Sequence, residues 1–309
     1  MARPLRFVPA DSVVEVTART IGSRFLLRPD ATINDLLKGV LGRAQHLYGV
    51  RVFAVAVMSN HLHALLGVEH GHQLAAFMQH ALANIAKVVG RRHRWAGPVW
   101  SRRYRSIVVA DSDSQVHRLR YVLCQGLKEG LVDRVDRWPG VSSFRALTRG
   151  EPFRGTWHDR TLAHETRQRG EKPDHRTTEQ SYELRLSPLP VLADMSVEEY
   201  RAFVCELVRD EERAVDASRA EAGKSAVLGA RRILDQDPLA APEETARSPA
   251  PLVHAASLAV RNAFVATYRA FVDAFKSAAA CLRDGFAVDF PEGSFPPPAP
   301  FVGMQPAAS

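Results

Sequence analysis

Two histidines form the pattern in this chain that is most capable of chemistry. His61 and His63 are separated by one residue in the segment Ser59-Asn60-His61-Leu62-His63. On a β-strand, alternate side chains point to the same face, so both imidazoles would lie side by side there. Two such imidazoles can bind one divalent metal ion and leave coordination positions for substrate oxygens. An isolated His-x-His can equally be a hydrogen-bonded surface pair, so this motif needs support from elsewhere.

A predicted helix that begins after Ser112 carries the second half of the pattern. Tyr121 and Gln125 lie one turn apart on it, away from its apolar stripe. A tyrosine hydroxyl can act as a covalent nucleophile, and a glutamine carbonyl can be a third, neutral metal ligand. His117 and Lys128 lie near Tyr121 on the same helix, and neither is assigned a role. The alternative is that Tyr121 is an ordinary half-buried packing residue.

The elements that must position these residues alternate between strand and helix patterns. Runs of β-branched residues predict strands, and apolar residues at spacings of three and four predict helices. This order indicates an α+β fold, in which helices cover one face of an antiparallel sheet, and its simplest form is ferredoxin-like. The predicted elements are a strand at 13–20, a helix at 31–48, two strands within 50–68 joined near Ser59-Asn60, a helix at 73–93, a strand at 99–109 and a helix at 112–130.

The chain divides into four predicted parts. Residues 1–150 are expected to form one domain that carries the histidine and tyrosine candidates, and the polar segment 151–195 is expected to be a linker. Residues 196–290 form a helical C-terminal region, which opens with a capping box at Ser196-Val197-Glu198-Glu199. Helices are predicted there at about 196–222, 226–234 and 255–283. Residues 291–309 are rich in proline and are expected to be a disordered tail.

Composition excludes several classes of protein. Of 309 residues, 46% are hydrophobic and 24% are charged, so a packed core is feasible and extensive disorder is excluded. There is no apolar run long enough for a membrane span, and the first residues lack the pattern of a secretory signal. Cys124, Cys205 and Cys281 are far apart, which argues against a disulfide scaffold and fits the reducing cytoplasm.

The net charge of +7 is distributed unevenly. Residues 1–150 hold 22 Lys and Arg against 10 Asp and Glu, whereas residues 151–309 hold 19 against 24. A basic first half favours a polyanionic partner such as nucleic acid, although a solvated arginine surface has the same charge. Arginines interleaved with aromatic rings suit single-stranded DNA. The DNA-binding candidates are Arg19, Arg24, Arg91, Arg92, Arg94, Arg102, Arg103, Arg105, Trp95, Trp100 and Tyr104.

Four ordered segments between residues 13 and 147 resemble one family. The segment Met58 to His63 resembles the Met-Pro-Asn-His-x-His motif of single-tyrosine HUH transposases, which include the REP-associated tyrosine transposases. The segments 100–104, 121–132 and 138–143 resemble the family's tryptophan-and-arginine strand, its Tyr-Ile-x-x-Asn-Pro-Val helix and its Trp-Pro-x-Ser-Ser segment. The chain departs from the pattern at Ser59, where the family has proline, and at Gln125-Gly126, where it has Asn-Pro.

The resemblance implies a function and roles for the residues. His61, His63 and Gln125 would bind Mg²⁺ or Mn²⁺, and Tyr121 would attack a phosphodiester of single-stranded or hairpin DNA. The implied products are a 5′-phosphotyrosine and a free 3′-hydroxyl. The expected setting is the bacterial cytoplasm, in association with the nucleoid. A homodimer is compatible with the family.

Two other functions remain open from the sequence. The first is a catalytically idle DNA-binding protein derived from such a transposase, which the Gln125-Gly126 departure favours slightly. The second is an RNA-binding ferredoxin-like module. That module would need paired aromatic residues on central strands, where the sequence offers mainly Phe53, so it ranks last.

Overall fold

The N-terminal part of the chain has the β-α-β-β-α-β order that a ferredoxin-like plan requires. The computed structural model describes residues 4–223, 226–243 and 250–295. The first elements are β1 (Ser12–Arg19), η1 (Ile21–Ser23), α1 (Ala31–Tyr48), β2 (Arg51–Val57), β3 (His61–Val68), α2 (Gly71–His93) and β4 (Arg105–Val109). The predicted strands and helices up to residue 93 are therefore confirmed. The strand predicted at 99–109 is regular only from Arg105, because residues 99–104 make a single bridge between Trp100 and Thr20.

The main sheet is mixed, with the strand order β2-β3-β1-β4-β7. The first four strands pair antiparallel, and in the β1–β3 pair Arg19 lies opposite His61 and Thr17 opposite His63. The two-residue strand β7 (Val253–His254) pairs in parallel with β4. The prediction of a purely antiparallel sheet is therefore wrong at one edge, where the C-terminal region adds a strand.

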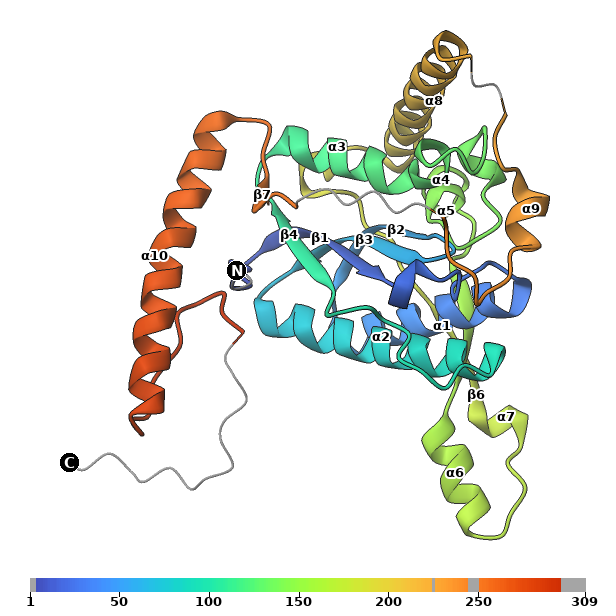
Figure 1. Cartoon of the computed structure of the whole chain (residues 1–309), viewed down its shortest axis with the longest axis horizontal. Helices are drawn as coiled ribbons and strands as arrows, with labels where there is room; N and C mark the ends of the chain where they lie inside the picture. The colour runs from blue at the N-terminus through green and yellow to red at the C-terminus, as the bar shows by residue number, and fades with distance from the viewer. Residues whose placement is uncertain (1–3, 224–225, 244–249, 296–309) are drawn as a thin grey trace.

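Helices cover both faces of this sheet, as Figure 1 shows for α1 and α2 below it and α3 (Ser112–Leu123) above it. Val14 and Val16 pack with α1 and α2, whereas Phe53 and Leu65 pack with α3. The α+β class is confirmed, but the prediction that helices cover a single face is wrong. Strand β3 is buried along its whole length, and a strand that is buried on both sides needs a covering layer on each.

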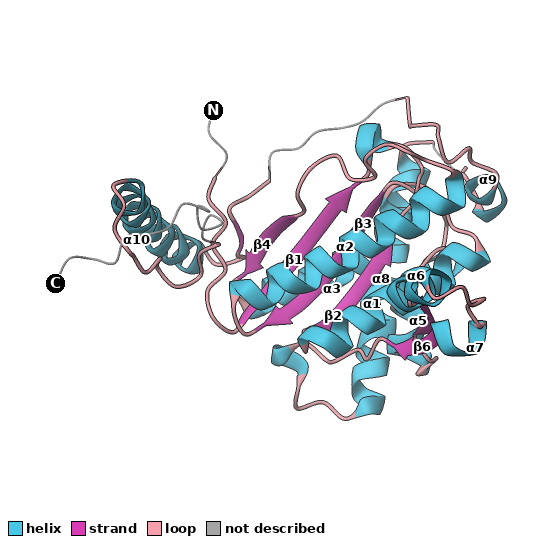
Figure 2. Cartoon of the chain, turned by 90° about the horizontal axis from the view of Figure 1, so that it is seen from below, coloured by secondary structure: helices cyan, strands magenta, loops and turns pink. Residues whose placement is uncertain are grey.

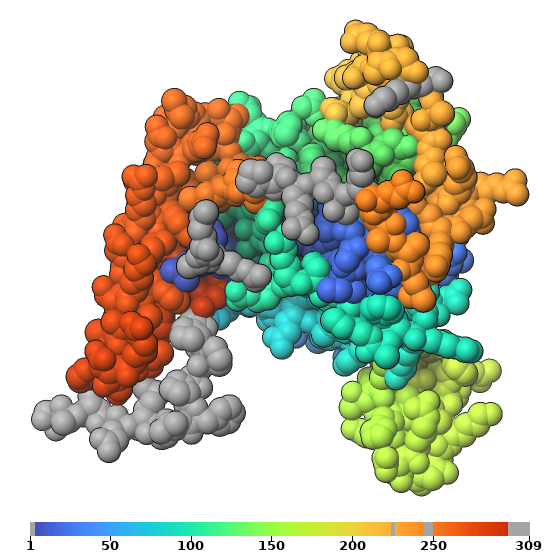
Figure 3. All heavy atoms as spheres, in the orientation of Figure 1, coloured from blue at the N-terminus to red at the C-terminus, as the bar shows by residue number. Residues whose placement is uncertain are grey.

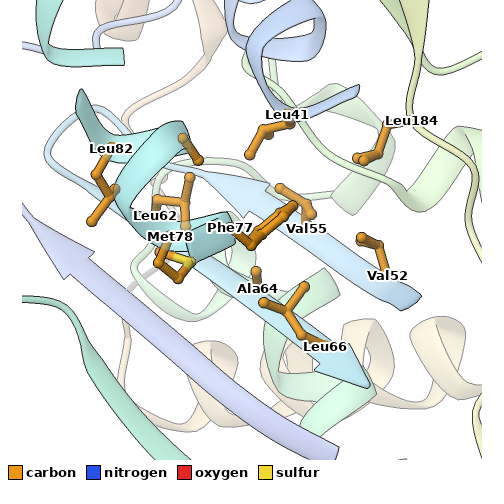
Figure 4. Close-up of a pocket in the computed structure, with 11 residues that line it drawn as sticks. Leu41, Val52, Val55, Leu62, Ala64, Leu66, Phe77, Met78, Leu82 and Leu184 are labelled. Carbon is orange, nitrogen blue, oxygen red and sulfur yellow. The ribbon is translucent and has the colours of Figure 1, made fainter. Parts of the chain in front are cut away.

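The face towards α1 and α2 is a close-packed apolar core. A void of roughly 10 Å³ lies between β2, β3 and these helices. The apolar side chains that line it are drawn in Figure 4. No polar group lines the void, and it is barely large enough for a single water molecule. This space is a packing feature, so the functional site must lie elsewhere.

The helix predicted at 112–130 is interrupted once. Asp111 caps α3 by accepting a hydrogen bond from Ser114 N, and the helix ends at Cys124. The next turn is α4 (Gln125–Lys128), where Lys128 N donates to Cys124 O. Tyr121 and Gln125 thus remain about one turn apart. The chain continues through η2 (Val135–Arg137) and α5 (Phe144–Arg149).

The prediction that residues 151–195 are a linker is wrong. They contain a two-stranded sheet packed against α1, with a helical lobe that Figure 3 shows in yellow-green. Gly39 and Gly155 allow this packing, because a Cβ on Gly39 would overlap with the backbone of Thr156 and one on Gly155 with Asp35 O. The elements are β5 (Arg154–His158), α6 (Arg160–Gln168), α7 (His175–Thr178), β6 (Glu179–Glu183) and η3 (Pro190–Leu192).

The C-terminal region is helical, as predicted. It contains α8 (Val197–Glu221), which opens with the predicted capping box, α9 (Ala230–Leu234) and α10 (Leu258–Arg283). Helix α10 lies beyond the β4 edge of the sheet (Figure 2), where Phe271 packs against Phe7. Of the predicted disordered tail, residues 291–295 are placed, with Gly293 O accepting from Val8 N, and 296–309 lie outside the described residues. Among the described helices, none is long and apolar enough to cross a membrane.

Candidate active site

His61 and His63 lie side by side on β3, on the sheet face that α3 covers. Their ring centroids are 5.0 Å apart, and both side chains are almost completely buried. This arrangement follows from the alternation of a strand, since Leu62 between them faces the opposite core. The predicted pairing of the two imidazoles is therefore found in the structure.

The neighbours of His61 define which of its ring nitrogens can bind a ligand. Asn60 Oδ1 lies 2.6 Å from His61 Nδ1, while Asn60 Nδ2 donates to Ser23 O. That second bond fixes the orientation of the amide, so Asn60 presents its oxygen and His61 Nδ1 carries the proton. The lone pair of His61 is then on Nε2, which is buried and forms no hydrogen bond with any described residue.

Glu129, which follows α4, faces that lone pair. Its Oε1 lies 3.3 Å from His61 Nε2. A carboxylate oxygen and an unprotonated imidazole nitrogen are both acceptors, so they repel at this distance unless a proton or a cation lies between them. The contact therefore marks a position that favours positive charge.

His63 is held through its other ring nitrogen by Glu15 on β1. His63 Nδ1 lies 3.1 Å from Glu15 Oε1 and 3.2 Å from Thr17 Oγ1. A carboxylate that accepts from Nδ1–H fixes the imidazole with its lone pair on Nε2, as is common for metal-binding histidines. Burial lowers the pKa of His63, and this effect outweighs the opposing influence of Glu15. The imidazole is thus kept neutral, which metal binding requires.

Glu15 is a buried carboxylate shared by three side chains. Arg118 Nη2 donates to its Oε1 at 2.9 Å. Its other oxygen lies 2.7 Å from Arg118 Nε and 2.9 Å from His254 Nε2, in close but poorly aligned ion-pair contacts. Burial raises the pKa of Glu15, but the contacts with His254, His63 and Arg118 outweigh burial and hold that pKa well below its ordinary value. Glu15 is therefore ionised in the folded protein.

Tyr121 lies beside His63 within the same chain. The two ring centroids are 5.5 Å apart in an edge-to-face arrangement. The guanidinium of Arg118, one turn earlier on α3, lies 3.6 Å from the centroid of the Tyr121 ring. Gln125 is buried, and its amide nitrogen donates to Tyr121 O at 3.1 Å, which leaves its carbonyl oxygen as the atom that could bind a cation.

The donor atoms of these side chains are of the kind that bind a divalent cation. Within the described ranges 4–223, 226–243 and 250–295, no group of three or more His, Cys, Asp or Glu side chains is placed to hold a metal ion. His61 and His63 each use Nδ1 in a hydrogen bond, and neither Nε2 forms one with a residue that the structure describes, while Gln125 supplies a neutral oxygen. Two imidazoles and an oxygen are a donor set that suits a divalent ion.

The sequence of this part of the chain matches a known family model. Residues 19–125 match the model described as IS200-like transposase, and that range includes both histidines, Tyr121 and Gln125. Over this range the chain is similar to IS200-like transposases, and we call residues 19–125 the transposase domain. Strands β2 to β4 and helices α1 to α3 lie within it.

Two solved structures resemble the transposase domain at lower similarity. A REP-associated tyrosine transposase bound to a REP hairpin has 18% identity and a TM-score of 0.42, over 48% of this chain and 87% of that one. A protein from Deinococcus radiodurans R1 assigned as a transposase has 20% identity and a TM-score of 0.29, over 40% and 95%. The similarity to transposases therefore rests on the family-model match over residues 19–125. No significant match is found among curated protein sequences.

Several predicted DNA-binding arginines lie at the same end of the transposase domain as His61. Arg19 is opposite His61 in the sheet, and Arg19 O accepts a hydrogen bond from Ser101 N. The exposed residues Arg102, Arg103 and Arg105 come shortly after Ser101 in the chain, so they lie near this end of the domain. Two of the other predicted arginines form contacts within the protein. Arg24 donates to Leu239 O and stacks over Trp95, and Arg92 pairs with Asp30 at 3.2 Å. Arg91 and Arg94 lie at the end of α2, where Arg91 is exposed.

The aromatic predictions fit less well. Tyr104 is buried beneath the guanidinium of Arg6, which lies 4.0 Å from its ring centroid, so the predicted base stacking on Tyr104 is wrong. Trp100 is half-buried and donates to Leu82 O, and Trp95 is half-buried and donates to Pro98 O. Both tryptophans pack partly against the core.

Two further features were missed by the sequence analysis. Residues 228–240 run along this end of the domain, since Leu228 N donates to Gly130 O and Ser59 Oγ to Gln236 Oε1. The second feature is a set of charged or titratable side chains around the histidines, namely Glu15, Arg118, Glu129 and His254. Glu15 could have been noticed in the sequence, because it is a single acidic residue within an otherwise mostly apolar strand. The other three reach the site through contacts between distant segments.

Proposed function

We propose that the transposase domain is a metal-dependent single-stranded DNA endonuclease and strand transferase that acts through Tyr121. The proposal rests mainly on one observation, the 5.5 Å distance between the Tyr121 and His63 rings within one chain. A phenol beside two imidazoles with free Nε2 lone pairs is an arrangement for covalent attack on a phosphodiester.

His61, His63 and the carbonyl of Gln125 would hold Mg²⁺ or Mn²⁺. When bound, such an ion polarises a phosphoryl oxygen and neutralises the charge that develops on it. Asn60 and Glu15 serve this role by keeping each imidazole in the tautomer with a free Nε2. Glu129, opposite His61 Nε2, adds negative charge that favours a cation there.

The covalent step uses this chain's own phenol. The Tyr121 hydroxyl gives its proton to water, its oxygen attacks phosphorus to form a new O–P bond, and the bond from phosphorus to the 3′-oxygen breaks. The 3′-oxygen takes a proton from water and leaves as a hydroxyl, while the 5′ end stays on the enzyme as a phosphotyrosine. The reverse attack by another strand's 3′-hydroxyl rejoins DNA without an external energy source. Arg118, against the ring, would stabilise the negative charge that develops on the phenol.

The DNA substrate would be held mainly through its phosphates. Arg19, Arg102, Arg103 and Arg105 supply positive charge next to His61. The first substrate to test is a hairpin with a single-stranded flank, because it offers both duplex and unpaired phosphates to these arginines.

The deciding test is a denaturing gel with a 5′-flanked hairpin oligonucleotide labelled on the side that would remain attached. With Mn²⁺, the wild-type chain should give a protein–DNA adduct, and with EDTA it should give none. Tyr121→Phe should bind the oligonucleotide with unchanged affinity but leave no adduct, and His61→Ala should lose the adduct while keeping most of its affinity. An adduct of equal yield from Tyr121→Phe would assign the nucleophile to another residue.

A second function is favoured by the contact between His61 and Glu129. If His61 carries a second proton, its Nε2–H donates to Glu129, and the site binds no metal. The protein would then be a catalytically idle DNA-binding protein. Hairpin binding without Mn²⁺ binding or adduct formation in the wild-type chain would select this function.

A further inference from the structure

The C-terminal region reaches the candidate active site through β7. This strand pairs with Val108 and Val109 of β4, and Ala110 N donates to His254 O at 2.9 Å. The His254 side chain is largely buried, and its Nε2 lies 2.9 Å from Glu15 Oε2. A residue more than a hundred positions beyond the transposase domain therefore contacts the carboxylate that holds His63.

We propose that His254 is a positioning residue for the active site, so that the C-terminal region completes a site whose reacting groups all lie in the transposase domain. The inference rests on the proposed function, since it concerns the orientation of His63 and Tyr121. It assigns β7 a role beyond covering the sheet edge.

The argument begins with the two oxygens of Glu15. Oε1 accepts from His63 Nδ1 and Arg118 Nη2, and Oε2 lies against Arg118 Nε and His254 Nε2. Arg118 contacts both oxygens and so sets the plane of the carboxylate, while His254 at Oε2 anchors the pair to β7. Without His254, Glu15 can turn together with Arg118, which moves Oε1 away from His63 Nδ1.

Rotation of Glu15 would affect both halves of the site. His63 Nδ1 would lose its acceptor, and the imidazole could then place its proton on Nε2, the nitrogen needed for the metal. Arg118 would move with its partner, and its guanidinium is the group that contacts the Tyr121 ring. His254 thus acts on the metal ligand and on the nucleophile through one shared carboxylate.

The proposal requires His254 to donate from Nε2, because two acceptors would repel at 2.9 Å. This requirement provides a matched pair of variants. In His254→Gln the amide nitrogen can take the place of Nε2, whereas in His254→Asn the amide is one methylene too short to reach Glu15. Val253→Ala is the control for β7 docking, since Val253 is buried and carries no polar group.

In the first measurement, the full-length proteins are titrated with Mn²⁺. Binding is detected as a loss of the electron paramagnetic resonance signal of the free ion. We expect His254→Asn to raise the Kd for Mn²⁺ by about tenfold, the lower end of the effect of outer-shell substitutions. His254→Gln and Val253→Ala should stay within about twofold of wild type. A His254→Asn protein that binds Mn²⁺ like wild type, or a Val253→Ala protein that loses as much affinity, would overturn the proposal.

The second measurement needs no metal and so remains decisive if the proposed function is wrong. In protein labelled with ¹⁵N-histidine, the His63 Nδ1–H should give a protected, downfield proton signal in wild type and in His254→Gln. It should exchange rapidly with water in His254→Asn, with an unchanged thermal unfolding midpoint. A protected signal in His254→Asn would refute the positioning role. A wild-type protein that shows the expected signals but forms no DNA adduct would instead refute the proposed function alone.

Discussion

The guanidinium of Arg118 lies 3.6 Å from the centroid of the Tyr121 ring while it forms a two-point contact with Glu15. The cation is therefore fixed by a buried carboxylate and covers one face of the proposed nucleophile. His63 meets the same ring at 5.5 Å and the same carboxylate at 3.1 Å. The nucleophile and one metal ligand are thus coupled through Glu15, although they come from different elements.

Substitution of Arg118 tests this coupling. Arg118→Met keeps the bulk of the side chain but removes the guanidinium that contacts both oxygens of Glu15, which should lower the free energy of unfolding by about 3–5 kcal/mol. Arg118→Lys should retain most of the stability but slow adduct formation by about 10- to 100-fold, because an ammonium cannot reproduce the planar two-point contact. Urea unfolding and a single-turnover gel assay measure the two effects. Arg120→Met, on the same helix but paired with Glu211, should leave the adduct rate within about twofold of wild type.

Glu129 provides a test of the cation position. In Glu129→Gln the amide removes the negative charge that faces His61 Nε2 at 3.3 Å. If a divalent ion binds between these groups, Mn²⁺ affinity measured by calorimetry should fall by about tenfold. Glu221→Gln at the end of α8 is the control and should bind Mn²⁺ like wild type. Unchanged affinity in Glu129→Gln would show that this carboxylate takes no part in metal binding.

The exposed arginines at the His61 end should act through phosphate contacts. Arg102→Ala with Arg103→Ala should weaken binding of single-stranded DNA to a similar extent for unrelated sequences. It should also reduce the slope of log K against log salt by about 0.7 for each lost contact. Fluorescence anisotropy at several salt concentrations measures both quantities. Arg209→Ala, exposed on α8 beside Glu206, should change neither, and a sequence-dependent loss would instead indicate base recognition.

The lowered pKa of His63 predicts a pH dependence in metal-free protein. Because folding lowers this pKa, the unfolded chain takes up the proton first. The stability that neutral His63 provides is complete above about pH 6.5 and is lost as the pH falls below that value. Imidazole ¹H–¹³C spectra should show His63 still neutral at a pH where an ordinary histidine is half protonated. Titration of His63 at or above pH 6.5 would contradict this prediction.

The parts of the fold that the sequence predicts are those with local signals. Helix α1 shows apolar residues at helical spacing, begins at Asp30 and ends at Gly49, whose φ of 66° suits glycine. Strand β7 has only two residues, too few for any pattern, and it forms because β4 offers an open edge. The contact of Gly39 with Thr156 joins segments more than a hundred residues apart, so the polar composition of 151–195 concealed an ordered unit.

The candidate site likewise has residues that the sequence predicts and residues that it does not. The pairing of His61 with His63 follows from the period of a strand, and the spacing of Tyr121 and Gln125 follows from the period of a helix. Glu15 and His254 enter the site through contacts between distant strands, which no spacing encodes. Tyr104 was misassigned because alternation along a strand does not tell which residue Arg6 will cover.

The pairing of β7 with β4 also affects how the protein can be dissected. Strand β4 pairs with β1 on one side, and on the other side Val108 and Val109 are covered by two residues of the C-terminal region. A fragment that ends near residue 150 keeps the whole family match but exposes the backbone N–H and C=O groups of that strand. Such an exposed edge is a template for pairing with another chain. The shortened protein should therefore self-associate and precipitate at concentrations at which the full-length chain does not. Oligomers of the fragment would then result from the truncation.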